Sequence, residues 1–276
     1  MRNLLNSAVS GAAIVAQGLF AALFPSDCRL CGIPLENISR LPVCPSCLLA
    51  MQLISGETCD ICGERLPGLQ RLSDLQTCAA CQEARPNFAK AAAYGSYEGD
   101  LRELIHLLKY EQVAPAAGAL GKMLGEAIDK LGIEFGAVLV IPVPLHSSKR
   151  RQRGFNQAEL IARAALKQPP MAQAELATDV LERRRPTVSQ IGLTRPQRSQ
   201  NIRGAFQVVH LNGVSGRNIL LVDDVLTTGT TASECARVLR KPGAKQVWVA
   251  TVARTLKNST ASFEIEPEFE TAAQSS

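Results

Sequence analysis

The sequence predicts an α/β protein in which helices flank a parallel sheet, preceded by a small N-terminal module that binds zinc. Two observations predict this division. Eight of the nine cysteines lie between positions 28 and 81, whereas from Phe88 onward apolar runs of strand length alternate with amphipathic helical segments. The composition agrees, because 46% of the 276 residues are hydrophobic and 20% are charged, which excludes a disordered chain. Aromatic residues make up only 4%, which argues against an aromatic-rich β-sandwich.

The net charge of +5 suits anionic ligands but is too small to establish nucleic-acid binding. We expect four parts along the chain. These are an amphipathic helix at 1–25, a double zinc ribbon at 26–86, the α/β domain at 87–256 and a disordered, acidic tail at 257–276.

The first 25 residues are apolar and nearly uncharged between Leu4 and Phe24. Asn6 and Gln17 interrupt the run, and no small-x-small cleavage site follows it. This favours an amphipathic helix that packs on the body of the protein or lies on a surface. An export signal and a membrane-surface anchor are the alternatives, and export would also oxidise the thiols described next.

The cysteines form four Cys-x-x-Cys pairs, and one tetrahedral zinc needs two such pairs. Twelve residues separate the first two pairs and fifteen separate the last two, which fits two zinc ribbons in succession. Four thiolates leave no open position on the metal, so we expect two structural zinc ions. The predicted ligands are Cys28, Cys31, Cys44, Cys47, Cys59, Cys62, Cys78 and Cys81.

Other uses of these cysteines are less consistent with the spacing. A disulfide framework does not require four such regular pairs, and a redox Cys-x-x-Cys motif normally occurs once. Sequential pairing along the chain is the simpler arrangement, and an interleaved one stays open. Cys235 lies in a predicted helix, where we expect a buried, small apolar side chain.

The first half of the α/β region contains two predicted strands and two predicted helices. Residues 90–94 have the composition of a strand, and Asp100 is expected to cap a helix at 100–110 whose apolar side chains share one face. A second helix is predicted at 115–131. The continuous apolar run 137–141 is typical of a strand buried on both faces.

The second half repeats the alternation. A helix at 156–166 is followed by a strand at 218–222, a helix at 230–240 and a strand at 246–252. Between them, residues 183–203 are basic and lack apolar periodicity, which predicts a mobile loop with a short helix. Strands that return through helices form a parallel sheet with helices on both faces.

The segment from Ile219 to Thr231 is the most informative about function. Its apolar strand ends in Asp223 and Asp224, at the edge where open α/β sheets bind ligands. The turn that follows presents backbone amides at a helix N-terminus, which suits a phosphate dianion. The carboxylates need hydroxyls or a metal, so a sugar phosphate satisfies both features, although a plain turn capped by the aspartates is the alternative. The turn residues are Thr227, Thr228, Gly229, Thr230 and Thr231.

This string resembles the phosphoribosyl pyrophosphate signature of type I phosphoribosyltransferases. Three further motifs, 141–146 (IPVPLH), 153–157 (RGFNQ) and 108–110 (LKY), together with the cysteine pairs, are similar to the ComF family. The resemblance implies that Asp223 and Asp224 hold the ribose 2′- and 3′-hydroxyls and that the turn 227–231 holds the 5′-phosphate. It covers about residues 20 to 255.

The resemblance also implies a pyrophosphate site in the loop that follows the strand at 137–141. The loop residues are Pro144, Leu145 and His146, with Lys149, Arg150 and Arg153 as nearby cations. Of these cations we expect Lys149 and Arg153 to be catalytic residues together with Asp223 and Asp224, although an exposed basic stretch is the alternative. A lone histidine after a strand is more often structural, and Lys109 is interpreted as a solvated lysine at a helix end.

The basic segment 183–198 corresponds by position to the flexible catalytic loop of that family, and a nucleic-acid contact is an equal alternative. The implied activity is Mg²⁺-dependent phosphoribosyl transfer in natural competence and DNA uptake. The alternative is a non-catalytic adaptor that binds single-stranded DNA and other competence proteins. We expect a cytoplasmic protein, with contact to the inner face of the membrane through the N-terminal helix left open. No aromatic-rich segment identifies the acceptor.

Overall fold

The computed structural model describes residues 26–35, 39–66, 76–134, 138–169, 171–186, 195–211 and 213–256. The helix expected at 1–25 and the tail expected at 257–276 lie outside these ranges. Within the described ranges, no helix has both the length and the apolar character needed to cross a membrane.

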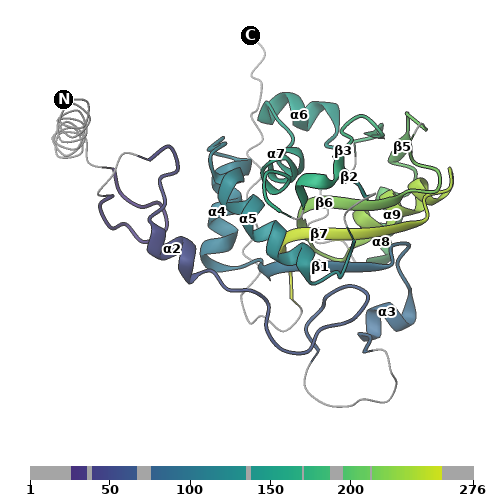
Figure 1. The fold of residues 1–276 in the computed structure, drawn as a ribbon, viewed down its shortest axis with the longest axis horizontal. Helices are drawn as coiled ribbons and strands as arrows, with labels where there is room; N and C mark the ends of the chain where they lie inside the picture. The colour runs from purple at the N-terminus through teal and green to yellow at the C-terminus, as the bar shows by residue number, and fades with distance from the viewer. Residues whose placement is uncertain are drawn as a thin grey trace, which may run out of the picture.

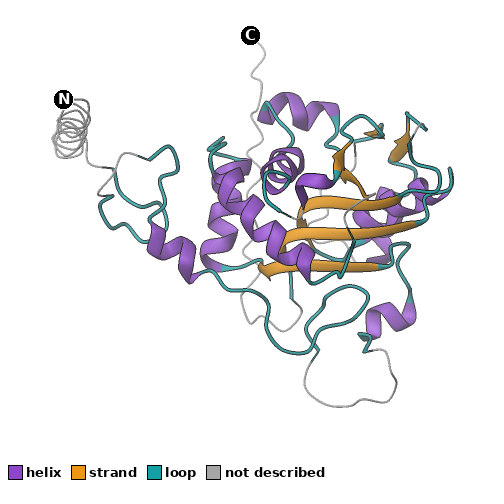
Figure 2. Cartoon of the chain, viewed as in Figure 1, coloured by secondary structure: helices purple, strands orange, loops and turns teal. Residues whose placement is uncertain are grey.

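A five-stranded parallel sheet forms the centre of the molecule (Figures 1 and 2). The strand order is β1-β7-β6-β2-β3. The strands are β1 (Lys90–Ser96), β7 (Gln246–Arg254), β6 (Asn218–Leu226), β2 (Val138–Pro142) and β3 (Glu175–Leu176). The parallel α/β fold predicted from the alternation is confirmed, while β3 was missed because two residues carry no periodicity.

Helices cover both faces of the sheet. Helices α4 (Gly99–Lys109), α5 (Ala116–Asp129) and α7 (Gln157–Ala165) share a core with Leu220 and Val222 of β6. Helices α8 (Arg195–Ile202) and α9 (Thr230–Arg240) share a second core with Ile219 and Leu221. Neighbouring strand residues point to opposite faces, so this alternation divides one apolar run between two cores.

The two cysteine-rich segments pack on opposite faces of this sheet. Cys28 and Cys47 belong to the core beneath α4 and α5, and α2 (Pro45–Ala50) carries Cys47. Cys59 and Cys62 belong to the core beneath α9, next to α3 (Ala79–Glu83). Figure 1 shows the first segment in purple on the side of α4, and the second in blue beside β1.

Two element predictions need correction. Helix α4 begins at Gly99 with Glu98 at its N-cap, so Asp100 lies in the first turn, where its charge favours the helix dipole, and is not the cap. Strand β6 continues past Val222 to Leu226, since it stays paired with β7 as far as Arg254. Asp223 and Asp224 therefore lie within the strand and not after it.

Short elements add to the predicted set. Helix α6 (Ser147–Arg153) was not expected, and it holds all three of the cations expected near the loop. The antiparallel pair of β4 (Leu181–Arg183) and β5 (Phe206–Val208) orders both ends of the segment expected to be a mobile loop, and α8 is the short helix predicted there. A single turn of 3₁₀ helix, η2 (Met171–Gln173), precedes β3.

Candidate functional site

The eight paired cysteines form two tetrads that pair sequentially along the chain. Within each tetrad the four sulfur atoms lie within 4.8 Å of one another. The Cys28–Cys47, Cys31–Cys44 and Cys62–Cys78 sulfurs are 3.9, 3.7 and 3.6 Å apart. Tetrahedral zinc with bonds of about 2.3 Å places its sulfur ligands about 3.8 Å apart, so both tetrads fit the metal. The first comprises Cys28, Cys31, Cys44 and Cys47, and the second Cys59, Cys62, Cys78 and Cys81.

The two tetrads share the same local backbone structure. In each, a zinc knuckle is the turn that contains the first Cys-x-x-Cys pair. A β-bridge joins Asp27 to Pro34 across the first knuckle, and another joins Thr58 to Arg65 across the second. The turn inside each contains a glycine with positive φ, 72° at Gly32 and 70° at Gly63, which other residues rarely adopt. The matching geometry of the two tetrads agrees with the two successive zinc ribbons predicted from the spacing.

Arg254 joins the second tetrad to the end of the sheet. Its guanidinium lies 2.8 Å from the Glu64 carboxylate, donates to the Cys62 carbonyl at 2.6 Å and reaches the Cys62 sulfur at 3.6 Å. The Arg254 and Glu64 side chains are only 5% and 7% exposed. Because Arg254 is the last residue of β7 and lies opposite Leu226 of β6, the tetrad is fixed to the edge that carries the aspartates.

The two aspartates of β6 face different surroundings. Asp224 points toward α4, where the Lys109 ammonium lies 3.1 Å from its Oδ1, while its Oδ2 is buried and has no hydrogen-bond partner among the described residues. Asp223 interacts electrostatically with Arg183 and with Cys235 of α9. Adjacent strand residues alternate between faces, so the carboxylates reach the ligand edge from opposite sides.

Burial raises the pKa of Asp223 to about 7, with a further contribution from the neighbouring Asp224 carboxylate. Its Oδ1 accepts a hydrogen bond from the Asp224 backbone N–H at 2.9 Å, which opposes the shift. Asp223 is therefore close to the point of protonation at neutral pH. A perturbed acid at the end of a sheet strand is typical of a functional position.

The turn after β6 has the backbone expected of a phosphate site. Gly229 is the N-cap of α9 and has a φ of 75°, so a side chain there would be strained. The Thr228 and Thr230 hydroxyls lie 2.6 Å apart across the turn. Thr227 is exposed and the other turn residues, Thr231 included, are half-buried. The structure thus presents hydroxyls and the free amide end of an eleven-residue helix at one surface.

The linker from the second tetrad packs against this same turn. Phe88 would lie 3.7 Å from a Cβ placed on Gly229. The Asn87 backbone and side-chain amides both donate to the Ser233 hydroxyl of α9 at 3.0 Å. The second tetrad therefore contacts the expected ligand edge through two routes, Arg254 and this linker.

The predicted pyrophosphate loop follows β2 and continues its register beside β6. The Val143 N–H donates to the Val222 carbonyl at 2.8 Å, and the side-chain amide of Asn156 donates to the Val143 carbonyl at 3.0 Å. Pro144, Leu145 and His146 are half-buried in this loop. His146 is the N-cap of α6 and its Nδ1 lies 2.8 Å from the Ser148 hydroxyl, which agrees with a structural role.

The three predicted cations lie on α6, which follows the loop, and not in the loop itself. Lys149 and Arg150 lie exposed on α6, and Arg153 is placed over the ring of Tyr110, 5.2 Å from its centroid. The structure therefore brings the aspartates, the turn and the loop to one edge, whereas Arg153 turns toward the end of α4.

Lys109 was wrongly interpreted as a solvated lysine. Its side chain is 13% exposed, and although burial alone would lower its pKa, the Asp224 carboxylate raises it. The sequence does contain a signal for this position, since Lys109 follows Ile105 by four residues and so shares the buried face of α4. The Tyr97 ring, 5.9 Å from the Lys109 ammonium, was missed as a neighbour because Tyr97 precedes α4 and is not adjacent to Lys109 in the sequence.

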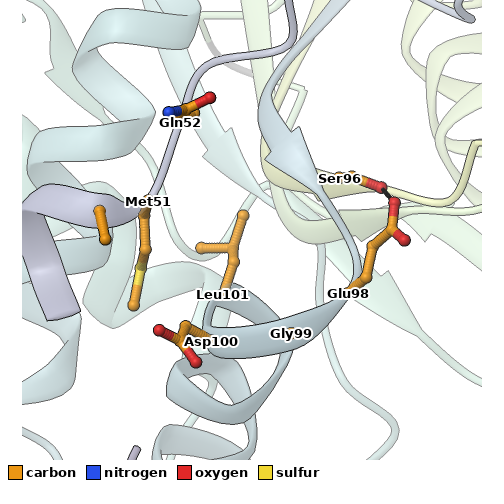
Figure 3. Close-up of a pocket in the computed structure, with 8 residues that line it drawn as sticks. Met51, Gln52, Ser96, Glu98, Gly99, Asp100 and Leu101 are labelled. Atoms are coloured by element: carbon orange, nitrogen blue, oxygen red, sulfur yellow. Dashed lines mark hydrogen bonds between the residues drawn. The ribbon is translucent and has the colours of Figure 1, made fainter. Parts of the chain in front are cut away.

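A pocket of about 410 Å³ lies elsewhere, between the end of α2 and the turn from β1 to α4. Figure 3 shows Met51 and Leu101 in this pocket and the Ser96 hydroxyl directed at the Glu98 carboxylate. None of the predicted site residues lines it. It belongs to the junction between the first tetrad and the sheet.

Comparison with known families matches two regions of the chain. Residues 19–82 match the double zinc ribbon domain, and residues 153–271 match the phosphoribosyl transferase domain.

Comparison with known proteins finds relatives over most of the chain. DNA utilization protein YhgH of Salmonella typhimurium is 31% identical over 238 residues, covering 84% of this chain and 98% of that protein. Competence protein F of Haemophilus influenzae is 29% identical over 222 residues, covering 79% and 93%. Competence protein ComFC of Bacillus subtilis is 26% identical over 207 residues, covering 73% and 79%.

Proposed function

This chain belongs to the ComF family, in which a double zinc ribbon precedes a phosphoribosyltransferase domain, and from that membership we propose that it binds phosphoribosyl pyrophosphate with Mg²⁺ and acts in the uptake or use of external DNA. One observation carries the binding proposal. Asp223, Asp224 and the Gly229 turn lie on a single strand–turn–helix at the carboxyl edge of the parallel sheet, beside the loop that follows β2.

The 5′-phosphate is assigned to the turn of residues 227–231. Its backbone amides begin α9, where the helix dipole favours a dianion. Gly229 removes the side chain at the point of closest approach, and Thr228 and Thr230 offer hydroxyl donors. No carboxylate is needed at this position, which leaves both aspartates for the sugar.

The ribose hydroxyls are assigned to Asp223 and Asp224. Carboxylate oxygens accept hydrogen bonds from hydroxyls, and Asp224 Oδ2 is a buried acceptor that the described residues leave unused. Lys109 neutralises Asp224 and holds it in position, so the lysine is a positioning residue in this proposal. Asp223 is the more accessible of the two acids.

The pyrophosphate is assigned to the loop of Pro144, Leu145 and His146, with Lys149 as a cation and with Arg153 as a second one once its side chain leaves the Tyr110 ring. Bound Mg²⁺ would neutralise pyrophosphate and ribose oxygens, mostly through water and with few protein ligands. If transfer follows, the bond from ribose C1 to pyrophosphate breaks as the acceptor's bond to C1 forms. The protein then contributes position and charge stabilisation and no nucleophile of its own.

Titration calorimetry with phosphoribosyl pyrophosphate and Mg²⁺ tests the binding proposal. We expect binding by the wild-type protein and loss of most affinity in the variant that carries both Asp223→Ala and Asp224→Ala. Release of pyrophosphate, measured with candidate acceptors, then tests transfer separately. Absence of binding by a folded wild-type protein would contradict the assignment.

A second candidate is a non-catalytic protein that binds single-stranded DNA. The arginines of the β4–β5 region favour it, because Arg184 and Arg185 are exposed next to Arg183. The Arg185 guanidinium also donates to the carbonyls of Asn201, in α8, and of Arg203, just after α8. These hydrogen bonds fix the position of the guanidinium. Phosphate contacts would make binding strongly dependent on salt. A gel shift with single-stranded DNA that shows no complex at low salt would exclude this candidate.

The cellular location is proposed from the chemistry of the cysteine thiols. Cysteine tetrads keep their zinc in a reducing compartment, so we place the protein in the cytoplasm. Other competence proteins are its proposed partners, and contact with the membrane through residues 1–25 is part of this proposal.

A further inference from the structure

The residues that connect the second tetrad to the sheet also hold the first turn of α9. Cys81 is the last ligand of that tetrad, and Asn87 follows shortly after it in the chain. The Asn87 backbone and side-chain amides both donate to the Ser233 hydroxyl at 3.0 Å. The Ser233 N–H in turn donates to the Gly229 carbonyl at 2.8 Å, which closes the first turn of the helix. The chain that leaves the tetrad therefore reaches the glycine of the phosphate turn through a short series of hydrogen bonds.

Apolar packing supports the same turn from the protein interior. Phe88 is 3% exposed, and its ring would lie 3.7 Å from a Cβ placed on Gly229, with the Leu226 side chain at 3.9 Å. Phe88 shares one core with the cysteines of the second tetrad and with Ala232 of α9. The tetrad, the linker and the start of the helix are thus packed together, and a close-packed interior transmits displacement from one part to the next.

The beginning of the phosphate turn has a separate connection to the second tetrad. The Thr255 N–H donates to the Leu226 carbonyl at 3.1 Å, directly before Thr227. The preceding residue, Arg254, donates to the Cys62 carbonyl at 2.6 Å. Both ends of the turn are therefore attached to segments that carry ligands of this tetrad.

The first tetrad packs on the other face of the sheet. Cys28 and Cys47 share a core with α4 and α5. Figure 1 shows α2, which carries Cys47, beside α4 and well apart from α9. Because the two tetrads have matching geometry, the first provides an internal control for the second.

Bound zinc determines whether these connections are in place. Metal binding and local folding are one process in a cysteine tetrad, because the site does not persist in the unfolded segment. Loss of the second zinc would release the linker and remove its restraint on the first turn of α9. Backbone amides bind a ligand best when they are already held in the bound geometry, since no ordering then opposes binding.

We infer that the second zinc tetrad, acting through the linker at Asn87 and Phe88, sets the affinity of the turn at Gly229 for a phosphate. The inference rests on the proposed function for the identity of that ligand, phosphoribosyl pyrophosphate. Asn87, Phe88 and Ser233 are positioning residues in it. Because coupling between two sites is reciprocal, bound phosphoribosyl pyrophosphate also protects the second zinc from a chelator and leaves the first zinc unaffected.

The test compares two cysteine variants of the full-length protein. Cys81→Ser and Cys47→Ser each remove the last ligand of one tetrad, and both cysteines are buried, so the variants are matched. Zinc analysis verifies which ion each variant has lost. Hydrogen exchange of the backbone amide at residue 233 reports the first turn of α9 without any ligand. Calorimetry with phosphoribosyl pyrophosphate and Mg²⁺ reports the affinity.

We expect the amide at residue 233 to exchange faster in Cys81→Ser by about fivefold or more, and the affinity to fall by about 5- to 100-fold. Cys47→Ser should match the wild-type protein in both measurements. Unchanged exchange in Cys81→Ser, or equal changes in the two variants, would overturn the inference. A wild-type protein that binds no phosphoribosyl pyrophosphate would instead refute the proposed function, while the exchange rates would still decide the coupling.

Variants of Ser233 test the linker with all zinc ligands in place. Ser233→Ala removes the acceptor of the Asn87 hydrogen bonds although alanine is the better helix former, and Ser233→Thr keeps the hydroxyl. Ser233→Ala should lower the affinity by about 2- to 10-fold and speed exchange of the amide, and Ser233→Thr should restore both. Wild-type exchange in Ser233→Ala would also overturn the inference, so the test stays decisive if Cys81→Ser does not fold.

Discussion

Lys109 Nζ lies 3.1 Å from Asp224 Oδ1, and the two side chains are only 13% and 7% exposed. This ion pair connects the last residue of α4 to the carboxyl end of β6. It neutralises one of two adjacent acids at the ligand edge, while Asp223 keeps the raised pKa of a partly buried carboxyl beside a second charge. The two aspartates of one motif therefore differ in their ion pairing and in their accessibility.

Removing Lys109 should destabilise the protein, because Asp224 would be left as a buried and unpaired charge. We expect Lys109→Met to lower the free energy of unfolding in urea by about 3 kcal/mol. Lys122→Met is the matched control, since Lys122 is exposed on the neighbouring helix α5 and should have little effect. Equal urea midpoints for the two variants would show that the ion pair does not stabilise the fold.

Asp223→Asn should stabilise the fold in a manner that depends on pH. The pKa of Asp223 is about 7 in the folded state, against about 3.9 for an unfolded aspartate. The wild-type protein thus has the full benefit of the protonated group below pH 4 and loses it as the pH rises through 7.

The stabilising effect of Asp223→Asn should consequently grow between pH 5 and pH 8, reaching on the order of 1–2 kcal/mol. Urea unfolding at both pH values measures it, and Asp129→Asn, an exposed aspartate of α5, is the control. An effect that is independent of pH would disprove the raised pKa. In the proposed function, the same stabilising substitution weakens binding of phosphoribosyl pyrophosphate.

Much of the fold follows from local pattern, and the corrections concern contacts between distant segments. The strands at β2, β6 and β7 were predictable because buried parallel strands are continuous apolar runs. The cysteine tetrads were predictable because each knuckle is a local turn. No local sequence pattern predicts the pair of Arg254 and Glu64, and Lys109 meets Asp224 only because the tertiary fold places the end of α4 beside β6.

The extent of β6 was missed for a related reason. Two adjacent aspartates are poor strand formers, so the sequence pattern predicts that the strand ends before them. Pairing with β7 keeps them in the sheet, where alternation sends their side chains to opposite faces.

Arg254→Met should release zinc from the second tetrad preferentially. The substitution removes the guanidinium that reaches the Cys62 sulfur and carbonyl, and it leaves the Glu64 carboxylate buried without its partner. A colorimetric chelator should then remove one of the two zinc ions faster than from the wild-type protein, by about tenfold or more, as for other partners that orient metal ligands.

Arg29→Met provides the control for that measurement. Arg29 also belongs to a zinc knuckle and pairs with Glu111 at 3.1 Å, but the two side chains are 60% and 47% exposed. Surface pairs contribute little, so its zinc should be released at the wild-type rate. If Arg254→Met released zinc at the wild-type rate, zinc binding by the second tetrad would not depend on its contact with the sheet.

Gly229→Ala should impair the phosphate turn through backbone strain and not through a clash. The φ of 75° disfavours a side chain, whereas the nearest atoms to a Cβ there are in ordinary contact at 3.7 Å. We expect a loss of about 1 kcal/mol in stability and weaker binding of phosphoribosyl pyrophosphate by calorimetry.

Gly118→Ala tests the opposite case within helix α5. Gly118 has no atoms within 4 Å of a Cβ, so alanine should stabilise the helix by about 0.5–1 kcal/mol and leave binding unchanged. If Gly229→Ala behaved like Gly118→Ala, the strained turn would have no part in ligand binding.

The most direct test is a crystal structure of the wild-type protein soaked with phosphoribosyl pyrophosphate and Mg²⁺. The account predicts the 5′-phosphate on the backbone amides of the turn at Gly229, with ribose hydroxyls within hydrogen-bond distance of Asp223 and Asp224. Ordered ligand bound away from the end of β6, with the aspartates uncontacted, would contradict it.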